Sequence, residues 1–226
     1  MLKVYQIYFK DEQLTDMDYT PYRNDDCTVF FENSVIRKLI EEKAHEDSDY
    51  FGVVSYQLKR KMGVTKTAWR GKAQIHNVSG VQFSTSDFQS KLMTALPDVM
   101  SFGRHMGHDP VTMADAFHPK FSMFFKEIMR RIGYSWEPVH INDIVYCNHF
   151  VAKSGIYEGY VKNMLSPAMD VMEQMPELYQ NSFYPCSLPD NLKVKFGVDY
   201  YPYHTFLAER FFSFYMHIHK LNCLHY

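Results

Sequence analysis

Residues 142–175 read NDIVYCNHFVAKSGIYEGYVKNMLSPAMDVMEQM, and this stretch decides which fold the sequence predicts. Its first part, residues 144–151, is a short apolar run rich in strand-forming residues, which is typical of a buried β-strand. The second part predicts a helix, because apolar residues recur along it at three- and four-residue spacing. Pro167 interrupts this pattern, so we expect the helix to kink or to restart with Ser166 as its N-cap. In a parallel α/β sheet, residues 148–153 would lie at the carboxyl edge, where such folds bind ligands, and they form the first candidate site.

The rest of the sequence alternates strand-like and helix-like segments, which predicts one α/β domain over residues 1–226. The order strand, helix, strand near its start is typical of a βαβ unit. We therefore expect a mainly parallel, Rossmann-like sheet flanked by helices, with irregular insertions at residues 57–86 and 103–117 available to form a cleft. Other expected strands cover residues 2–9, 50–56 and 98–102, other expected helices cover about residues 34–44, 87–96, 121–132 and 204–220, and residues 176–202 are expected to be irregular.

The composition is typical of a globular protein, with 46% hydrophobic and 22% charged residues. A formal net charge of −2 gives no general reason to expect a nucleic-acid or membrane partner. The four cysteines are widely spaced and form no CxxC pair, which favours a reducing compartment over a structural zinc site. No apolar run approaches the roughly 20 residues of a membrane span. The expected location is therefore the cytoplasm.

The sharpest charge asymmetry lies in residues 57–86, which contain no acidic residue and six basic ones. This segment begins where the strand at residues 50–56 should end. It could receive a diphosphate or another anion. The alternative is a solvated basic hairpin, because most runs of charge are solvated.

Several common catalytic motifs are absent: there is no GxGxxG after the first strand, no GxxxxGK[ST], no GxSxG and no HExxH. Two D-x-D spacings could hold Mg²⁺ or Mn²⁺, at Asp16 with Asp18 and at Asp47 with Asp49. Neither is well placed, since the first follows its strand at a distance and the second precedes a strand. The loop residues His105, His108 and Asp109 could also ligate a metal, but without a fourth ligand they are more simply polar loop residues. A divalent metal is therefore compatible with the sequence but not required by it.

Glu209 and Arg210 lie near the start of an aromatic helix, HTFLAERFFSFYM. A partly buried charge there would need a partner or a ligand. The alternative is that Glu209 falls on the polar side of the helix and is solvated.

Six segments occur in an order that resembles one protein family: FFENSVIRKLI, DYFGVVSY, ALPDVMSF, HPKFSMFFKEIMRRIGY, YCNHFVAKSGIYEGYVKNMLSPAMDVME and YHTFLAERFFSFYM. From about residue 2 to residue 219, the chain resembles bacterial and phage glycosyltransferases of the capsular-polysaccharide type. The resemblance implies a GT-A-like fold that transfers a sugar from a nucleotide donor, most often a uridine diphosphate (UDP) sugar, to a carbohydrate acceptor. It also places DYFGVVSY, YCNHFVAK and AERFFSFY around the active cleft.

Such a transferase needs a nucleotide pocket, cationic charge near the departing diphosphate and a base for the acceptor hydroxyl. We expect Lys59, Arg60 or Arg210 to supply the charge. Glu209 and His204 are the candidates for the base or for an orienting group. Contacts to the nucleotide and donor are expected from Tyr5, Gln6, Ser55, Tyr56, Asn148 and His149.

Two other functions remain compatible with the sequence. One is a phage-type transferase that glycosylates modified DNA bases, with the basic residues 57–72 contacting the nucleic acid. The other is a non-catalytic carbohydrate-binding domain in which the many aromatic rings stack on sugars; the sequence has 17 Tyr and 18 Phe. A Phe-rich core is the simpler explanation for any single ring.

Overall fold

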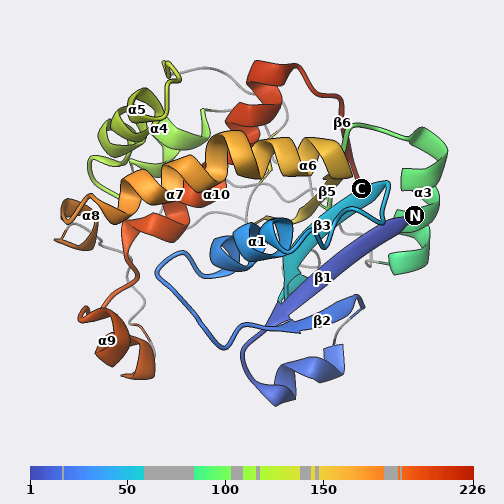
Figure 1. Ribbon diagram of the computed structural model, residues 1–226, viewed down its shortest axis with the longest axis horizontal. Helices are drawn as coiled ribbons and strands as arrows, with labels where there is room; N and C mark the ends of the chain where they lie inside the picture. Colours follow the sequence, from blue (N-terminus) through green and yellow to red (C-terminus); the bar gives the residue numbers. More distant parts are fainter. Residues whose placement is uncertain are drawn as a thin grey trace.

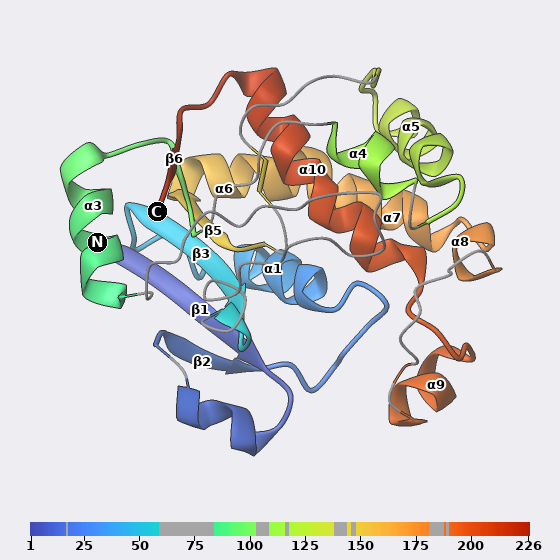
Figure 2. The same ribbon diagram turned by 180° about the vertical axis from the view of Figure 1, so that it is seen from behind.

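A computed structural model describes residues 1–16, 18–58, 84–102, 109–115, 118–137, 144–145, 148–180, 188 and 190–226. The described residues form an α/β fold, in which a six-stranded mixed sheet is flanked by helices (Figures 1 and 2). The strand order is β2-β1-β3-β5-β4-β6. Their bounds are Leu2–Tyr8 (β1), Thr20–Arg23 (β2), Tyr50–Ser55 (β3), Val99–Ser101 (β4), Phe150–Lys153 (β5) and Cys223–His225 (β6).

Besides the helix predicted after residue 151, apolar periodicity predicted four helices, and all four are present. They are Glu32–Glu41 (α1), Thr85–Ala95 (α3), Phe121–Arg131 (α5) and Tyr203–His219 (α10). No helix in the described part of the chain combines the length and the apolar character needed to cross a membrane. Of the two predicted insertions, residues 59–83, 103–108 and 116–117 lie outside the described residues. The remaining described helices are Pro110–Ala114 (α4), Ser154–Tyr160 (α6), Ser166–Glu173 (α7), Glu177–Gln180 (α8) and Asp190–Phe196 (α9). There is also a 3₁₀ helix at Asp11–Asp16 (η1) and a π-helix at Val161–Leu165 (η2).

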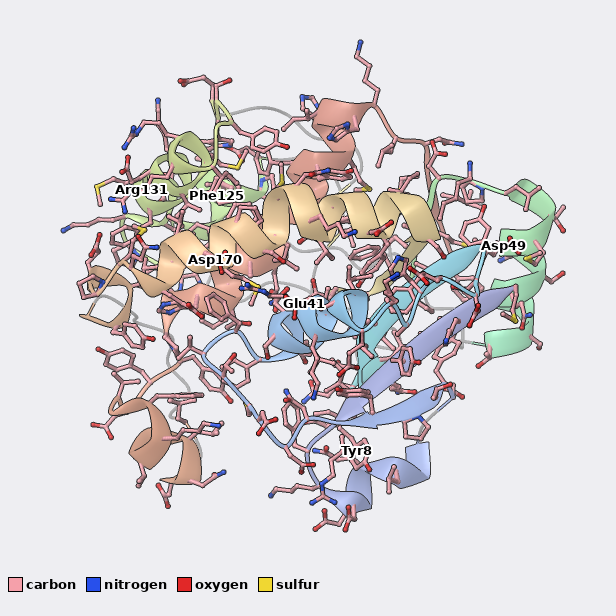
Figure 3. The ribbon with its side chains drawn as sticks, in the orientation of Figure 1. Tyr8, Glu41, Asp49, Phe125, Arg131 and Asp170 are labelled. Atoms are coloured by element: carbon pink, nitrogen blue, oxygen red, sulfur yellow. The ribbon has the colours of Figure 1, made fainter. Side chains whose placement is uncertain are left out.

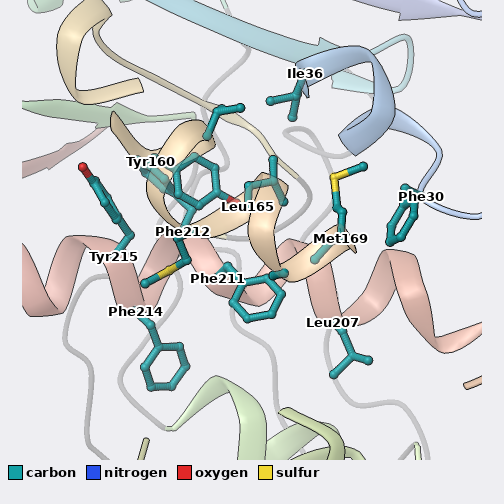
Figure 4. Packing of buried hydrophobic residues seen from close by; sticks show 14 of the residues in the cluster. Phe30, Ile36, Tyr160, Leu165, Met169, Leu207, Phe211, Phe212, Phe214 and Tyr215 are labelled. Carbon is teal, nitrogen blue, oxygen red and sulfur yellow. The ribbon is translucent and has the colours of Figure 1, made fainter. Parts of the chain in front are cut away.

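The main hydrophobic core lies between one face of the sheet and the helices α1, α5, α6, α7 and α10. Helix α10 lies behind the α6–α7 helix in Figure 1 and in front of it in Figure 2. Its Phe212 ring stacks on Phe150 of β5 with ring centroids 3.6 Å apart, and Phe211 stacks on Phe125 of α5 at 4.8 Å. Figure 4 shows Phe211 and Phe212 on α10 among the buried residues of this core. Helix α3 covers the other face, where Phe88 stacks on Phe102 at 4.1 Å.

Five of the six strands run in the same direction, as expected for a mainly parallel sheet, but β5 is antiparallel to both of its neighbours, so the sheet is mixed. Parallel pairing holds for β1 with β2, β1 with β3, and β4 with β6. The apolar pattern of a buried strand is the same in either direction, so the sequence could not reveal this reversal. Because Lys153 pairs with Tyr50, the first residue of β3, the predicted site at residues 148–153 is split: Lys153 lies at the amino edge, whereas Asn148 and His149 lie at the carboxyl edge.

Strands β2 and β6 were not predicted from the sequence. Both are short edge strands, and β2 contains Pro21, which lacks an N–H and is tolerated only where a sheet ends. Parallel pairing of β2 with β1 brings the carboxyl ends of these two strands together, with Tyr8 opposite Arg23. In Figure 3, the label Tyr8 marks the carboxyl edge of the sheet, where β1 and β2 end, and the label Asp49 marks the opposite, amino edge, where β3 begins.

Of the two predicted outcomes at Pro167, a kink or a restart with Ser166 as N-cap, the N-cap is wrong. Ser166 has helical dihedral angles, φ −62° and ψ −48°, and is the first residue of α7, while α6, η2 and α7 form one continuous helical path from Ser154 to Glu173. The α-helical pattern is interrupted by the π-helix η2, which ends at Leu165, two residues before Pro167. A π turn widens the helix locally, which suits a proline that has no N–H and would clash with a carbonyl of the preceding turn.

Candidate functional site

Buried polar side chains are concentrated at the carboxyl edge of the sheet. Twelve polar side chains are buried in the described part of the chain. Six of them lie at or near the points where β1, β2, β3 and β4 end or where β5 begins, and a seventh, Asn33 in the first turn of α1, is hydrogen-bonded to one of the six. A buried polar side chain is costly unless it is hydrogen-bonded, so such a concentration indicates a specific role. We call these seven residues the edge group: Gln6, Asn24, Asn33, Ser55, Ser101, Asn148 and His149.

A contact between the side chains of Ser55 and His149 joins the end of β3 to the start of β5. Ser55 Oγ lies 3.2 Å from His149 Nε2, although the two residues are 94 positions apart in sequence. The backbone N–H of Gln57 also donates to Ser55 Oγ, at 3.3 Å. The sequence predicted both Ser55 and His149 as site residues, and the antiparallel direction of β5 is what lets them meet.

Gln6 uses its amide to hold neighbouring segments together. Its Nε2 donates to the Ser55 carbonyl at 3.4 Å, and its Oε1 accepts the backbone N–H groups of Asp18 at 2.9 Å and Tyr19 at 3.3 Å. The carbonyl oxygen of the amide therefore has both of its acceptor positions occupied by the protein. Gln6 is at the predicted site, where it connects β1 to β3 and to the segment that leads into β2.

Asn148 and Asn33 connect the start of β5 to helix α1. Asn148 adopts a left-handed conformation with φ 55°, which Asn tolerates better than most residues, and its Nδ2 donates to Asn33 Oδ1 at 3.2 Å. Because α1 begins at Glu32, the Asn33 side chain lies within the first turn, where its Nδ2 donates to the carbonyl of Phe30 at 3.2 Å.

Asn24 was missed by the sequence analysis, and its side-chain amide has an unused donor. Its backbone N–H donates to the Tyr8 carbonyl at 2.9 Å, which fixes it beside the end of β1. The side chain is buried, and among the residues that the structure describes Nδ2 has no hydrogen-bond partner. Next along the edge, the half-buried rings of Phe9 and Tyr56 meet edge to face with centroids 6.1 Å apart. A lone Asn after a short strand has no sequence signature that could have identified it.

Tyr5 was predicted as a nucleotide contact, but the structure does not bring it to the edge. It pairs with Val53, two residues before the end of β3. Its ring packs on Tyr22 and Phe51, with centroids 6.0 Å away in both cases. The structure therefore places Tyr5 beneath the site, within the sheet face that α1 covers.

The predicted base His204 lies in the core at the start of α10. It has no exposed surface, and its ring packs against Phe30 and Tyr179 with centroids 5.3 Å and 4.6 Å away. Neither ring nitrogen makes a hydrogen bond of normal geometry within the described residues. Burial lowers the pKa of His204 to about 4, and the Met172 carbonyl acts in the opposite direction. His204 is therefore a neutral core residue at pH 7, which argues against its exchanging a proton with an acceptor.

Glu209 and Arg210 form an ion pair on the side of α10 that faces α5. Arg210 Nη1 lies 3.2 Å from Glu209 Oε2, and their side chains are 14% and 16% exposed. The Arg210 guanidinium also lies 5.8 Å from the centre of the Phe121 ring. Burial and the Arg210 charge lower the pKa of the nearby His118 to about 4. These contacts favour the interpretation of a structural ion pair over a solvated Glu209.

The remaining predictions concern cations and metals. Lys59, Arg60, His105 and His108 lie outside the described residues, so their predicted roles stay predictions. Asp49 immediately precedes β3 and lies at the amino edge, away from the edge group (Figure 3). Within the residues that the structure describes, no three His, Cys, Asp or Glu side chains come together as a metal site.

The carboxyl edge thus carries an amide with a free donor, two aromatic rings, a serine–histidine contact and two asparagines in contact. Amides and rings of this kind can recognise a planar heterocycle, and a histidine can move a proton. A scan against protein-family models and a search of curated proteins each find no match for the chain. Its function is therefore inferred from the geometry of this edge.

Proposed function

We propose that the protein is a glycosyltransferase that moves a sugar from a nucleoside-diphosphate sugar, expected to be a UDP-sugar, to a carbohydrate hydroxyl. The observation that carries the proposal is the edge group: of the twelve buried polar side chains of the described chain, six lie at one edge of an α/β sheet and a seventh, Asn33, contacts them from α1. Ligands of α/β folds bind outside the carboxyl ends of the strands. The proposal includes the GT-A-like identity of the fold, which the resemblance implies.

The nucleotide would bind across the ends of β2, β1 and β3. Asn24 Nδ2, which is buried and has no partner in the described part of the chain, would donate to a carbonyl of the base. The adjacent rings of Phe9 and Tyr56 provide apolar surface against which the base can pack. From there the diphosphate would extend toward the end of β3 and the start of β5. Lys59 and Arg60, which are predicted to contact the diphosphate, follow β3 in the sequence.

A thermal-shift screen tests the proposal with UDP-, GDP-, CDP- and dTDP-sugars, each with and without Mg²⁺ or Mn²⁺. A ligand at 100 times its Kd stabilises the native state by about 2.7 kcal/mol. For a chain of this size, we expect a rise in melting temperature of roughly 5–10 °C with the donor. The free sugars and inorganic diphosphate serve as controls, and neither should match the shift.

If no nucleotide sugar raises the melting temperature at millimolar concentration, the proposal is wrong. A shift by free sugars alone would instead indicate a carbohydrate-binding domain. Binding of duplex DNA with a steep dependence on salt concentration would indicate an enzyme that acts on nucleic acid.

A further inference from the structure

The contact between Ser55 and His149 brings a hydroxyl within hydrogen-bond reach of an imidazole, at 3.2 Å. This separation is the one expected for a hydroxyl activated by an adjacent base. Of the two predicted bases, His204 is enclosed by Phe30 and Tyr179 in the core, and Glu209 is ion-paired with Arg210. Ser55 and His149 are also largely buried, at 2% and 7% exposed, but they lie at the carboxyl edge of the sheet. The carboxyl edge therefore has a proton acceptor that the sequence did not identify in this role.

Both members of the contact are held by the sheet. Ser55 pairs with Ile7 of β1, and its carbonyl accepts the Gln6 amide. The carbonyl of His149 accepts the backbone N–H of Phe102 at 3.0 Å, and the next residue, Phe150, is stacked under α10. A catalytic group is most precise when it is mounted on rigid elements that lock its geometry.

The hydrogen bonds of Ser55 favour proton transfer toward His149. The Gln57 N–H occupies one lone pair of Ser55 Oγ. A hydroxyl has a single proton to donate, and Nε2 is an acceptor when the imidazole carries its proton on Nδ1. In this tautomer Ser55 donates to His149, and its oxygen keeps a lone pair for the proton of an incoming hydroxyl.

We propose that Ser55 and His149 are the proton-accepting pair of the transfer reaction, an inference that rests on the proposed function. The acceptor oxygen attacks the anomeric carbon, and the bond from that carbon to the diphosphate oxygen breaks, with its electron pair leaving on the nucleoside diphosphate. The acceptor proton passes to Ser55 Oγ while the Ser55 proton passes to His149 Nε2. Serine is unchanged at the end of the step, and the imidazolium then releases its proton to solvent.

The test compares His149→Gln, Ser55→Ala and Ser55→Thr with the unmodified protein in two assays. Calorimetry measures the affinity for UDP, and release of UDP from the UDP-sugar selected by the screen measures turnover with water as the acceptor. We expect His149→Gln to lose at least about 100-fold in turnover, as is typical for loss of a general base, with UDP affinity within threefold. Ser55→Ala should lose at least about tenfold, and Ser55→Thr should recover most of that loss because it keeps the hydroxyl.

Normal turnover in folded His149→Gln would overturn the inference, as would equal turnover in Ser55→Ala and Ser55→Thr. If a variant loses UDP affinity and turnover in parallel, the pair binds the donor and is not the base, while the proposed function stands. If the unmodified protein binds none of UDP, GDP, CDP and dTDP, the proposed function fails, and this inference fails with it. Should His149→Gln not fold, the two Ser55 variants decide the question by themselves.

Discussion

Phe212→Ala is expected to lower the free energy of unfolding by about 3–5 kcal/mol, the usual range for removing a buried aromatic ring. Phe212 is 1% exposed and stacks on Phe150, with ring centroids 3.6 Å apart. It also meets Tyr160 edge to face at 4.9 Å, so its removal leaves a cavity between α10, β5 and the α6–η2 helix (Figure 4). Because Phe150 directly follows His149, the same cavity should loosen the start of β5.

Urea denaturation at 25 °C measures this loss. Met123→Ala is the matched control, because Met123 is an apolar residue of α5 that is 53% exposed and should change stability by no more than about 0.5 kcal/mol. A loss below 1 kcal/mol in Phe212→Ala would mean that the ring does not hold β5 against α10.

The second large effect is expected at the ion pair of Arg210 with Glu209. Replacing Arg210 by Gln leaves the Glu209 carboxylate largely buried without its partner, which costs about 3 kcal/mol when a pair is sheltered from solvent. Turnover per folded molecule should stay within twofold, because the contacts of Arg210 are to α10 and Phe121 rather than to the edge group. Melting temperature and turnover are measured on the same preparation.

The control for this variant is Arg130→Gln, which removes an ion pair to Glu127 from the surface. The Arg130 side chain is 70% exposed, and exposed pairs contribute little to stability. If Arg210→Gln keeps its melting temperature but loses turnover by orders of magnitude, the pair belongs to the active site, as the family resemblance implied. If neither quantity changes, the pair is unimportant in both respects.

Local periodicity was enough to predict most of the helices and the central strands. The faces of α5 and α10 follow directly from apolar residues at helical spacing, and β3 follows from its apolar run. The directions of the strands and the presence of the edge strands could not be predicted from local periodicity. The apolar run leading into β5 is equally compatible with parallel and antiparallel pairing, and β2 has too few buried residues to produce a pattern.

For the same reason, only part of the candidate site was predicted from the sequence. Ser55 was identified near the end of an apolar run and His149 as part of residues 148–153, which a parallel strand would have placed at the carboxyl edge, but their contact depends on how β5 pairs with β3. Asn24 and Asn33 were missed as site residues because their importance comes from burial and from hydrogen bonds between distant segments. Conversely, His204 and Tyr5 are located on predicted elements, yet His204 is fully buried in the core and the half-buried Tyr5 ring packs on Tyr22 and Phe51.

The most direct test of the nucleotide site is a calorimetric titration of UDP into the unmodified protein, Asn24→Leu and Tyr160→Phe. Both substitutions remove a buried polar atom that forms no hydrogen bond with any residue the structure describes, so neither should lower the melting temperature. Tyr160 lies in the core beside Phe212, whereas Asn24 lies at the carboxyl edge. We expect the Kd for UDP to rise about tenfold in Asn24→Leu, corresponding to about 1.4 kcal/mol, and to stay unchanged in Tyr160→Phe. Equal UDP affinity in all three proteins would contradict the assignment of this edge as the nucleotide site.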